Sequence, residues 1–211
     1  MNTETFLTQR LICVAIIDRA DDAVPLAEAL LAGGLKVMEV TFRTADAAES
    51  IRRIRQGVPQ IAIGAGTLLT AENVRQASAA GAQFGVSPGL SEVVSSAAQA
   101  CRLPLFPGVV TPSEIMRALE LGWRHLKFFP SETFGGVSAL KALAGPFGHA
   151  GVKFVPTGGI TPATLPSYLA MPQVAAVGGS WMAERKPVAE GAWSRITALA
   201  ADAVQIVAEA R

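Results

Sequence analysis

The stretch "QIAIGAGTLLTAENVRQASAAGAQFGVSPG", residues 60–89, contains one complete strand–helix–strand pattern. Its first apolar run, residues 60–66, ends at glycine. Residues 70–82 follow with an amphipathic, alanine-rich pattern that opens on threonine and closes on glycine and alanine, which is typical of a capped helix. A second apolar run, residues 82–87, then stops at proline and glycine. The stretch therefore predicts a β-α-β arrangement.

The same alternation extends over the whole chain. Residues 21–34, 111–122 and 161–170 repeat the helical pattern between short apolar runs. The runs that we expect to be strands are residues 11–17, 35–41, 60–66, 82–87, 103–108, 125–130, 152–158 and 174–180. Eight β-α units without a compositional break predict an α/β fold, a single (β/α)8 TIM barrel domain over residues 1–211 with a short N-terminal lead-in at about 1–10. A doubly wound open sheet is the main alternative, and the pattern alone does not exclude it.

Composition and charge indicate which kind of molecule the protein binds. Half of the 211 residues are apolar, 17% are charged, and 18 basic against 17 acidic residues leave a net charge of +1. This balance does not indicate nucleic acid or an anionic membrane as partner, so we expect a small molecule. Cys13 and Cys101 are far apart and form no C-x-x-C pair, which favours reduced thiols. With no leader pattern and no run of about 18 apolar residues, a cytoplasmic, soluble protein is expected.

The sequence does not indicate a metal site or a nucleotide-binding site. The only histidines are His125 and His149, and no acidic residues accompany them at metal-ligand spacing, so no metal is expected. His125 shares strand parity with Lys127 but lies earlier in the run, which favours a place in the core. The "GAGTLLT" motif at residues 64–70 matches neither a Walker loop nor a complete G-x-G-x-x-G motif. The tryptophans Trp181 and Trp193 are expected in packing or subunit contacts.

Unusual residues collect where the predicted strands end. In a (β/α)8 barrel the chemistry lies at the carboxyl ends of the strands and in the loops that follow them. The residues at these ends are Glu39, Thr67, Pro88, Lys127, Gly158, Gly159, Gly178, Gly179 and Ser180. Because all of them fall at one rim of the predicted barrel, we expect a single functional site there.

Lys127 and Glu39 are the charged pair of this rim. A lysine inside an apolar run is unusual, because an ammonium group is costly to remove from water. Strand alternation places both side chains on the inward face, where they can meet across the barrel mouth. That arrangement suits amine catalysis with a proton shuttle. A buried structural ion pair is the alternative that these two residues alone leave open.

Two glycine pairs predict an anion site. The motifs "PTGGI" at residues 156–160 and "GGSW" at residues 178–181 follow the seventh and eighth runs. Their backbone N–H groups can approach an anion without interference from a Cβ. Loops after strands 7 and 8 are frequent phosphate sites in barrels, so the two motifs together predict phosphate binding.

Seven motifs, in this order and spacing, resemble the 2-dehydro-3-deoxy-phosphogluconate aldolase family over almost the entire chain. They are "MEVTFRT" (38–44), "GAGT" (64–67), "GVSPGL" (85–90), "KFFPSE" (127–132), "AGPF" (144–147), "VPTGGI" (155–160) and "VGGSW" (177–181). The resemblance implies a class I aldolase on a (β/α)8 barrel, usually homotrimeric and without a cofactor. Such enzymes cleave a six-carbon keto-deoxy acid phosphate into pyruvate and glyceraldehyde 3-phosphate.

The resemblance also implies a role for each matching residue. Lys127 would form the Schiff base and Glu39 would shuttle the proton. The residues implied in substrate binding are Arg43 and Thr67 for the pyruvate carboxylate, Gly158, Gly159, Gly179 and Ser180 for the phosphate, Thr157 for the C4 hydroxyl, and Pro88 and Phe129 for the pocket wall. For Phe129, ordinary core packing remains an equal alternative. Attack on a ketone needs a neutral amine, so burial and a nearby cation such as Arg43 are expected to favour loss of the proton from Lys127.

Departures from the family pattern leave substrate preference open. Many relatives carry proline at the position of Cys13 and a smaller residue at that of Val110. Aldolases for 4-hydroxy-2-oxoglutarate or the 6-phosphogalactonate analogue are therefore alternatives. Two functions from other classes also remain: a non-covalent sugar-phosphate isomerase and a non-catalytic sensor of phosphorylated ligands.

Overall fold

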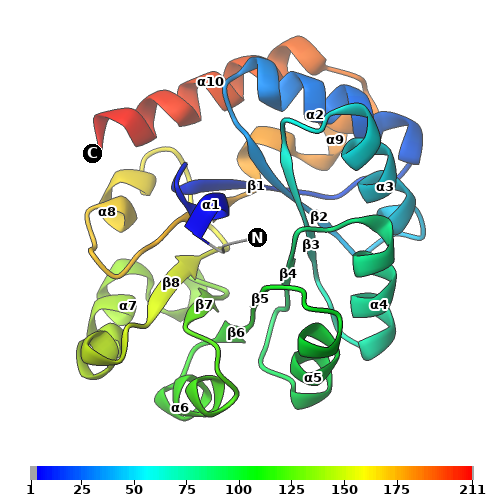
Figure 1. Cartoon of the computed structure of the whole chain (residues 1–211). Helices are drawn as coiled ribbons and strands as arrows, with labels where there is room; N and C mark the ends of the chain where they lie inside the picture. The colour runs from blue at the N-terminus through cyan, green and yellow to red at the C-terminus, as the bar shows by residue number, and fades with distance from the viewer. Residues whose placement is uncertain (1–3, 211) are drawn as a thin grey trace.

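The computed structural model describes residues 4–210, in which parallel strands alternate with helices (Figure 1). The strands are β1 (Leu11–Ala15), β2 (Val37–Thr41), β3 (Ala62–Gly66), β4 (Phe84–Val86), β5 (Leu105–Phe106), β6 (Gly108–Val109), β7 (His125–Phe128), β8 (Lys153–Pro156) and β9 (Val177–Gly179). The α-helices are α1 (Glu4–Leu7), α2 (Ala23–Ala32), α3 (Ala47–Gly57), α4 (Ala71–Ala80), α5 (Glu92–Ala100), α6 (Pro112–Glu120), α7 (Gly136–Ala144), α8 (Leu165–Leu169), α9 (Arg185–Ala189) and α10 (Trp193–Glu209). Short 3-10 helices are η1 (Ala20–Asp22), η2 (Glu132–Phe134), η3 (Gly145–Ala150) and η4 (Trp181–Ala183). The first three residues of the predicted lead-in lie outside the described residues.

The strands form two parallel sheets. One has six strands in the order β5-β4-β3-β2-β1-β9, and the other has three in the order β6-β7-β8. Two isolated parallel bridges, Phe154 to Val174 and Thr157 to Gly178, link the flank of β8 to that of β9. Figure 1 shows the strands curling around a centre, with α1 near this centre and the other helices outside the strands, unlike a doubly wound open sheet. The α/β class and a curled parallel sheet are confirmed, whereas one continuous eight-stranded sheet is not observed.

A proline divides the predicted fifth strand. Residues 103–108 were expected to form one strand, but the structure has β5 and β6 on either side of Pro107. β5 pairs with β4, and β6 pairs with β7. Proline has no N–H group to donate, so it interrupts a ladder at its own position. The Pro107 carbonyl still accepts a hydrogen bond from the Lys127 N–H at 2.9 Å, which keeps β7 in place.

Large side chains fill the interior at the amino ends of the strands. Inward-facing apolar residues of this cluster include Ile12, Val37, Phe84 and Phe106, all at most 4% exposed. Phe6 from α1 joins them, with its ring centroid 5.2 Å from that of Phe84. Burial of this apolar surface closes the interior at that end. The open end of the curled sheet is therefore the carboxyl end.

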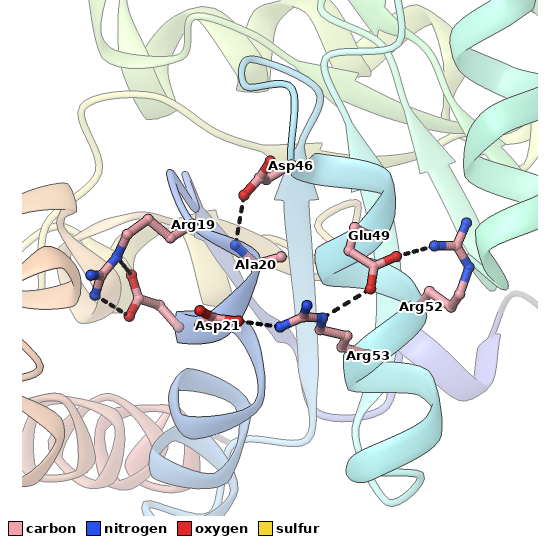
Figure 2. Close-up of polar contacts among 8 residues, drawn as sticks. Arg19, Ala20, Asp21, Asp46, Glu49, Arg52 and Arg53 are labelled. Carbon is pink, nitrogen blue, oxygen red and sulfur yellow. Dashed lines mark hydrogen bonds and ion pairs between the residues drawn. The ribbon is translucent and has the colours of Figure 1, made fainter.

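Polar contacts join the segment after β1 to α3. Figure 2 shows the Ala20 N–H donating to Asp46 Oδ2 at 2.8 Å. In the same view Arg53 bridges Glu49 and Asp21, at 2.9 Å and 2.5 Å. Exposed ion pairs add little to stability, about 0–1 kcal/mol each. These contacts instead fix a position, because they hold the segment after β1 against α3 and against Asp46, the residue before it.

Two features are absent from residues 4–210. No helix in this range is both long and apolar enough to cross a membrane. The same residues contain no group of three or more histidine, cysteine or acidic side chains able to hold a metal ion.

Candidate active site

A cavity of about 220 Å³ opens at the carboxyl ends of the strands. Its wall includes every site residue predicted from the sequence: Glu39, Arg43, Thr67, Pro88, Lys127, Phe129, Thr157, Gly158, Gly159, Gly179 and Ser180. The structure thus brings together residues from six strands and the loops after them. Further wall residues, to which the sequence assigned no role, are Val14, Ile16, Thr41 and Ile160, and Gly178 of the predicted glycine pair also lies in the wall. Strand parity could have found Thr41, which lies two residues after the inward-facing Glu39.

Lys127 and Glu39 face each other inside this cavity. Lys127 Nζ lies 3.9 Å from Glu39 Oε1, and the two residues are only 6% and 3% exposed. Lys127 Nζ also lies 4.7 Å from the centroid of the Phe129 ring, within cation–π range. The amine is therefore bounded by a carboxylate and an aromatic face. The half-buried Phe129 side chain thus lies in the cavity wall.

Burial controls the ionisation of Glu39. Removal from water raises the pKa of its carboxyl group above the ordinary value, and the nearby Lys127 charge counteracts this only in part. Glu39 Oε1 has no hydrogen-bond partner among the described residues. A raised pKa moves the carboxyl group toward the range in which it can both accept and donate a proton near neutral pH.

The turn after β3 gives the Glu39 carboxyl group its space. A Cβ added at Gly66 would overlap Glu39 Oε1, so no larger residue fits beside the present position of the carboxylate. The next residue, Thr67, has a φ angle of +56°, which is uncommon for a β-branched residue. Such outliers cluster at binding and active sites. Thr67 lies at the cavity wall, in agreement with that tendency.

The loop that carries Arg43 is held by hydrogen bonds, whereas the Arg43 side chain is not. Its backbone N–H donates to the Thr41 carbonyl at 2.8 Å, and the hydroxyl of Thr44 donates to the Ile17 carbonyl at 2.6 Å. The exposed guanidinium group of Arg43 forms no hydrogen bond or ion pair with another described residue. A planar guanidinium at the cavity wall is suited to bind a carboxylate in a bidentate manner.

The loop after β7 is hydrogen-bonded to the glycine loop after β8. The N–H groups of Ser131 and Glu132 donate to the carbonyls of Thr157 and Gly158, at 2.8 Å and 3.0 Å. The buried Tyr168 hydroxyl donates to Glu132 Oε1 at 2.5 Å and lies 2.8 Å from Ser131 Oγ. Burial and the Glu132 carboxylate raise the pKa of Tyr168 to about 12, so this hydroxyl keeps its proton. The sequence analysis did not find this network.

The predicted anion loops present backbone to the cavity. Gly158 and Gly159 have φ angles of +101° and +79°, which side-chain-bearing residues rarely adopt. A Cβ at Gly159 would lie 2.8 Å from Glu132 Cβ, and one at Gly179 would overlap the Trp181 ring. Glycine is therefore required at these positions for close approach. The resulting concave backbone surface suits an anion.

The comparison with known proteins identifies the family. The family model described as KDPG and KHG aldolase matches residues 3–199. The chain belongs to the KDPG and KHG aldolase family. Its sequence is 49% identical over 198 residues to a 2-dehydro-3-deoxy-phosphogluconate aldolase of Treponema pallidum, covering 94% of this chain and 93% of that protein.

Solved structures of KDPG aldolases resemble this chain. The KDPG aldolase of Legionella pneumophila, with pyruvate captured at low pH as a covalent carbinolamine intermediate, superposes with a TM-score of 0.90 at 41% identity. That similarity covers 95% of this chain and 97% of the Legionella chain. A 2-keto-3-deoxy-6-phosphogluconate aldolase of Zymomonas mobilis with 3-phosphoglycerate gives a TM-score of 0.85 at 44% identity, covering 96% and 95% of the two chains.

The positions at which this KDPG and KHG aldolase family member departs from the expected pattern lie outside the cavity wall. Cys13 is fully buried in the apolar core, and Val110 packs against that core. His125 is half-buried at the start of β7, where its ring centroid lies 6.2 Å from that of Phe106. None of the three is among the residues that line the cavity.

Proposed function

We propose that this protein is a class I aldolase that cleaves 2-dehydro-3-deoxy-6-phosphogluconate into pyruvate and glyceraldehyde 3-phosphate. The observation that carries the proposal is the buried pair of Lys127 Nζ and Glu39 Oε1, 3.9 Å apart at the wall of the cavity. Membership of the KDPG and KHG aldolase family supports it. The covalent carbinolamine of the Legionella relative supports the same chemistry.

Lys127 supplies the covalent step. Its neutral amine attacks the C2 ketone to give a carbinolamine, which loses water to form a protonated imine. The imine withdraws the electron pair of the C3–C4 bond as the C4 hydroxyl loses its proton. Bond cleavage releases the aldehyde phosphate and leaves an enamine on Lys127. Protonation at C3 and hydrolysis then release pyruvate and restore the amine.

Glu39 moves the proton in both halves of this sequence. As a carboxylate it accepts the C4 hydroxyl proton during cleavage, and as the acid it returns a proton to C3 of the enamine. The raised pKa of its buried carboxyl group suits a group that must alternate between these forms.

The remaining wall residues orient the substrate. Arg43 and Thr67 bind the carboxylate of the pyruvate part, and the Thr157 hydroxyl lies near the C4 hydroxyl. The backbone of the two glycine loops, Gly158–Gly159 and Gly179–Ser180, binds the phosphate. Pro88 and Phe129 shape the apolar wall between these two ends.

The architecture that we propose is one (β/α)8 barrel domain over residues 1–211, in which the two curled sheets act as one closed wall. The isolated bridges between the flanks of β8 and β9 support this closure. The resemblance to the aldolase family further predicts a homotrimer. Light scattering coupled to size-exclusion chromatography tests that prediction, and a monomeric mass would contradict it.

Trapping with borohydride tests the covalent proposal. Incubation with pyruvate and sodium borohydride, followed by peptide mass spectrometry, is expected to place a reduced pyruvate adduct on Lys127. The Lys127→Arg variant is expected to form no adduct and to release no pyruvate in a coupled assay. Lys153→Arg is the matched control, because this exposed lysine lies on the neighbouring strand β8 and contacts the Pro172 carbonyl outside the cavity.

Other outcomes would indicate the other classes of function. An isomerase would turn over a sugar phosphate and leave Lys127 unmodified by borohydride. A sensor would bind phosphorylated ligands without pyruvate release. Either result would overturn the aldolase proposal.

A second substrate is 4-hydroxy-2-oxoglutarate, because the matching family description also names KHG aldolase. This compound offers the same C2 ketone to Lys127 but carries a carboxylate in place of the phosphate end. The ratio of kcat/KM for the two compounds measures the preference, and we expect the phosphorylated compound to be favoured.

A further inference from the structure

Gly178 is a buried glycine of the cavity wall that the proposed mechanism does not use. The family resemblance assigns the phosphate to its neighbours Gly179 and Ser180. Gly178 belongs to β9, and its φ angle lies outside the left-handed region that favours glycine. Its backbone conformation therefore does not require glycine, and the reason for the missing side chain must lie in the space around it.

The side chain of Thr157 occupies that space. A Cβ added at Gly178 would lie 2.4 Å from Thr157 Oγ1 and 3.1 Å from Thr157 Cγ2. A Cβ atom does not approach another heavy atom to 2.4 Å, so something must shift when position 178 carries a side chain. The hydroxyl of Thr157 is the atom closest to the added Cβ. An alanine at position 178 and the present place of this hydroxyl therefore exclude each other.

Hydrogen bonds and strand pairing hold both backbones in place. The Thr157 N–H donates to the Phe128 carbonyl at 3.0 Å, and the Thr157 carbonyl accepts from the Ser131 N–H at 2.8 Å. Gly178 is in register with Ile12 of β1, and an isolated parallel bridge joins Gly178 to Thr157. Because neither backbone is free to retreat, a methyl group at position 178 must turn the Thr157 hydroxyl away.

The Thr157 hydroxyl lies beside the path from the amine to the predicted phosphate loops. Val155 is in register with Lys127 on the neighbouring strand, and Thr157 is the next residue toward the rim on the face of Val155. A substrate joined to Lys127 at C2 and bound by its phosphate at the glycine loops must pass this hydroxyl with C4 and C5, which carry hydroxyl groups. The Thr157 hydroxyl makes only a long hydrogen bond, 3.4 Å, within the protein. It is therefore available to these substrate hydroxyls.

We propose that Gly178 determines substrate preference, because the absence of its side chain lets the Thr157 hydroxyl lie over β9 and face the hydroxyl-bearing carbons of the substrate. The inference rests on the proposed aldolase function. It makes Gly178 a positioning residue, since it acts through Thr157 and does not anchor the phosphate.

A set of variants separates the space at Gly178 from the hydroxyl of Thr157. Gly178→Ala adds the methyl group, and Thr157→Val removes the hydroxyl. Thr157→Ala removes both atoms that the methyl group would meet most closely. In the double variant Gly178→Ala/Thr157→Ala, the closest remaining atom of residue 157 is its Cβ, at 3.3 Å. Gly148→Ala is the matched control, because a Cβ there meets nothing within 4 Å.

The measurements compare the gluconate-type and galactonate-type substrates. We expect Gly178→Ala to lower the ratio of their kcat/KM values about tenfold, the effect of one lost hydrogen bond, and Thr157→Val to lower it equally. In the Thr157→Ala background, Gly178→Ala should change this ratio by less than about twofold, because coupled residues are not additive. The inhibition constant of inorganic phosphate and the yield of the borohydride-trapped pyruvate adduct should stay unchanged. Neither ligand carries the C4 and C5 hydroxyls.

Other results would overturn the inference. A loss of the same size in the Thr157→Ala background would mean that the methyl group meets the substrate itself. Weaker inhibition of Gly178→Ala by inorganic phosphate would assign Gly178 to the phosphate site. An unchanged ratio in Thr157→Val would also contradict the inference, and this measurement does not depend on the folding of Gly178→Ala. Failure of the proposed function has a different signature, because the wild-type protein itself would then form no trapped adduct.

Discussion

Gly66 and Glu39 occupy one shared space on neighbouring strands, because a Cβ on Gly66 would overlap the Oε1 atom of Glu39. The position of the Glu39 carboxyl group is therefore decided partly by a residue that carries no side chain. In this place beside β3, the Oε1 atom of Glu39 lies 3.9 Å from Lys127 Nζ.

Gly66→Ala is expected to displace Glu39 while the fold remains. The new methyl group must push the carboxyl group away from Lys127, so we expect kcat for pyruvate release to fall by roughly 100-fold, within the range for loss of general acid–base catalysis. Circular dichroism should retain the wild-type spectrum. Gly145→Ala is the control, because a Cβ there meets nothing within 4 Å. Wild-type activity in Gly66→Ala would contradict the role given to Glu39.

Glu39 is expected to make stability fall as pH rises. Burial raises the pKa of Glu39 in the folded protein above the ordinary value of 4.5, so the folded protein retains a proton that the unfolded chain has released. The contribution of the protonated Glu39 to the free energy of unfolding is fully present below a pH of about 4.5. It is lost as the pH rises from there through the raised pKa. The difference in the free energy of unfolding between the wild type and Glu39→Gln should therefore decrease over that interval. Urea unfolding at several pH values measures it, and a pH-independent difference would refute the pKa shift.

Thr157→Val is expected to relax substrate preference. The Thr157 hydroxyl makes only a long hydrogen bond, 3.4 Å, to the Val155 carbonyl and remains available to the C4 hydroxyl of a substrate. Its removal should reduce the kcat/KM ratio between the gluconate-type and galactonate-type substrates about tenfold, the effect of one lost hydrogen bond. Borohydride trapping with pyruvate, which has no C4 hydroxyl, should be unchanged. An unaltered ratio would place the discrimination elsewhere.

Tyr168→Phe is expected to weaken phosphate binding. The variant leaves the Glu132 carboxylate without its donor at 2.5 Å and loosens the loop that holds Gly158 through the Glu132 N–H. We expect the KM of the phosphorylated substrate to rise about fivefold, the equivalent of roughly 1 kcal/mol. The KM for 4-hydroxy-2-oxoglutarate, which lacks a phosphate, serves as the internal control. Equal increases for both substrates would indicate general damage to the site.

Much of the site could be predicted because strands have a period of two. Glu39 and Lys127 fall on inward-facing positions by parity alone, and the ends of parallel strands necessarily meet at one rim. The pattern also predicted each strand, although usually a few residues too long. It missed the interruption at Pro107, where the missing N–H divides one run into β5 and β6.

The network of Tyr168 with Ser131 and Glu132 illustrates what sequence reasoning could not reach. Tyr168 is 37 residues from Ser131, and nothing in the local pattern of α8 shows that its hydroxyl points toward the loop after β7. The same holds for the hydroxyl of Thr157 over Gly178, since the approach of these two residues depends on how the flanks of β8 and β9 meet.

The amino-acid sequence alone was enough to determine the α/β class and to place Glu39 and Lys127 at one rim, because both depend on periodicity along the chain. Only the tertiary structure decided the 3.9 Å approach of Lys127 to Glu39, the space that Gly66 leaves for it and the division of the strands into two sheets. These features depend on packing between segments distant in sequence, where a few tenths of an ångström decide whether two groups touch.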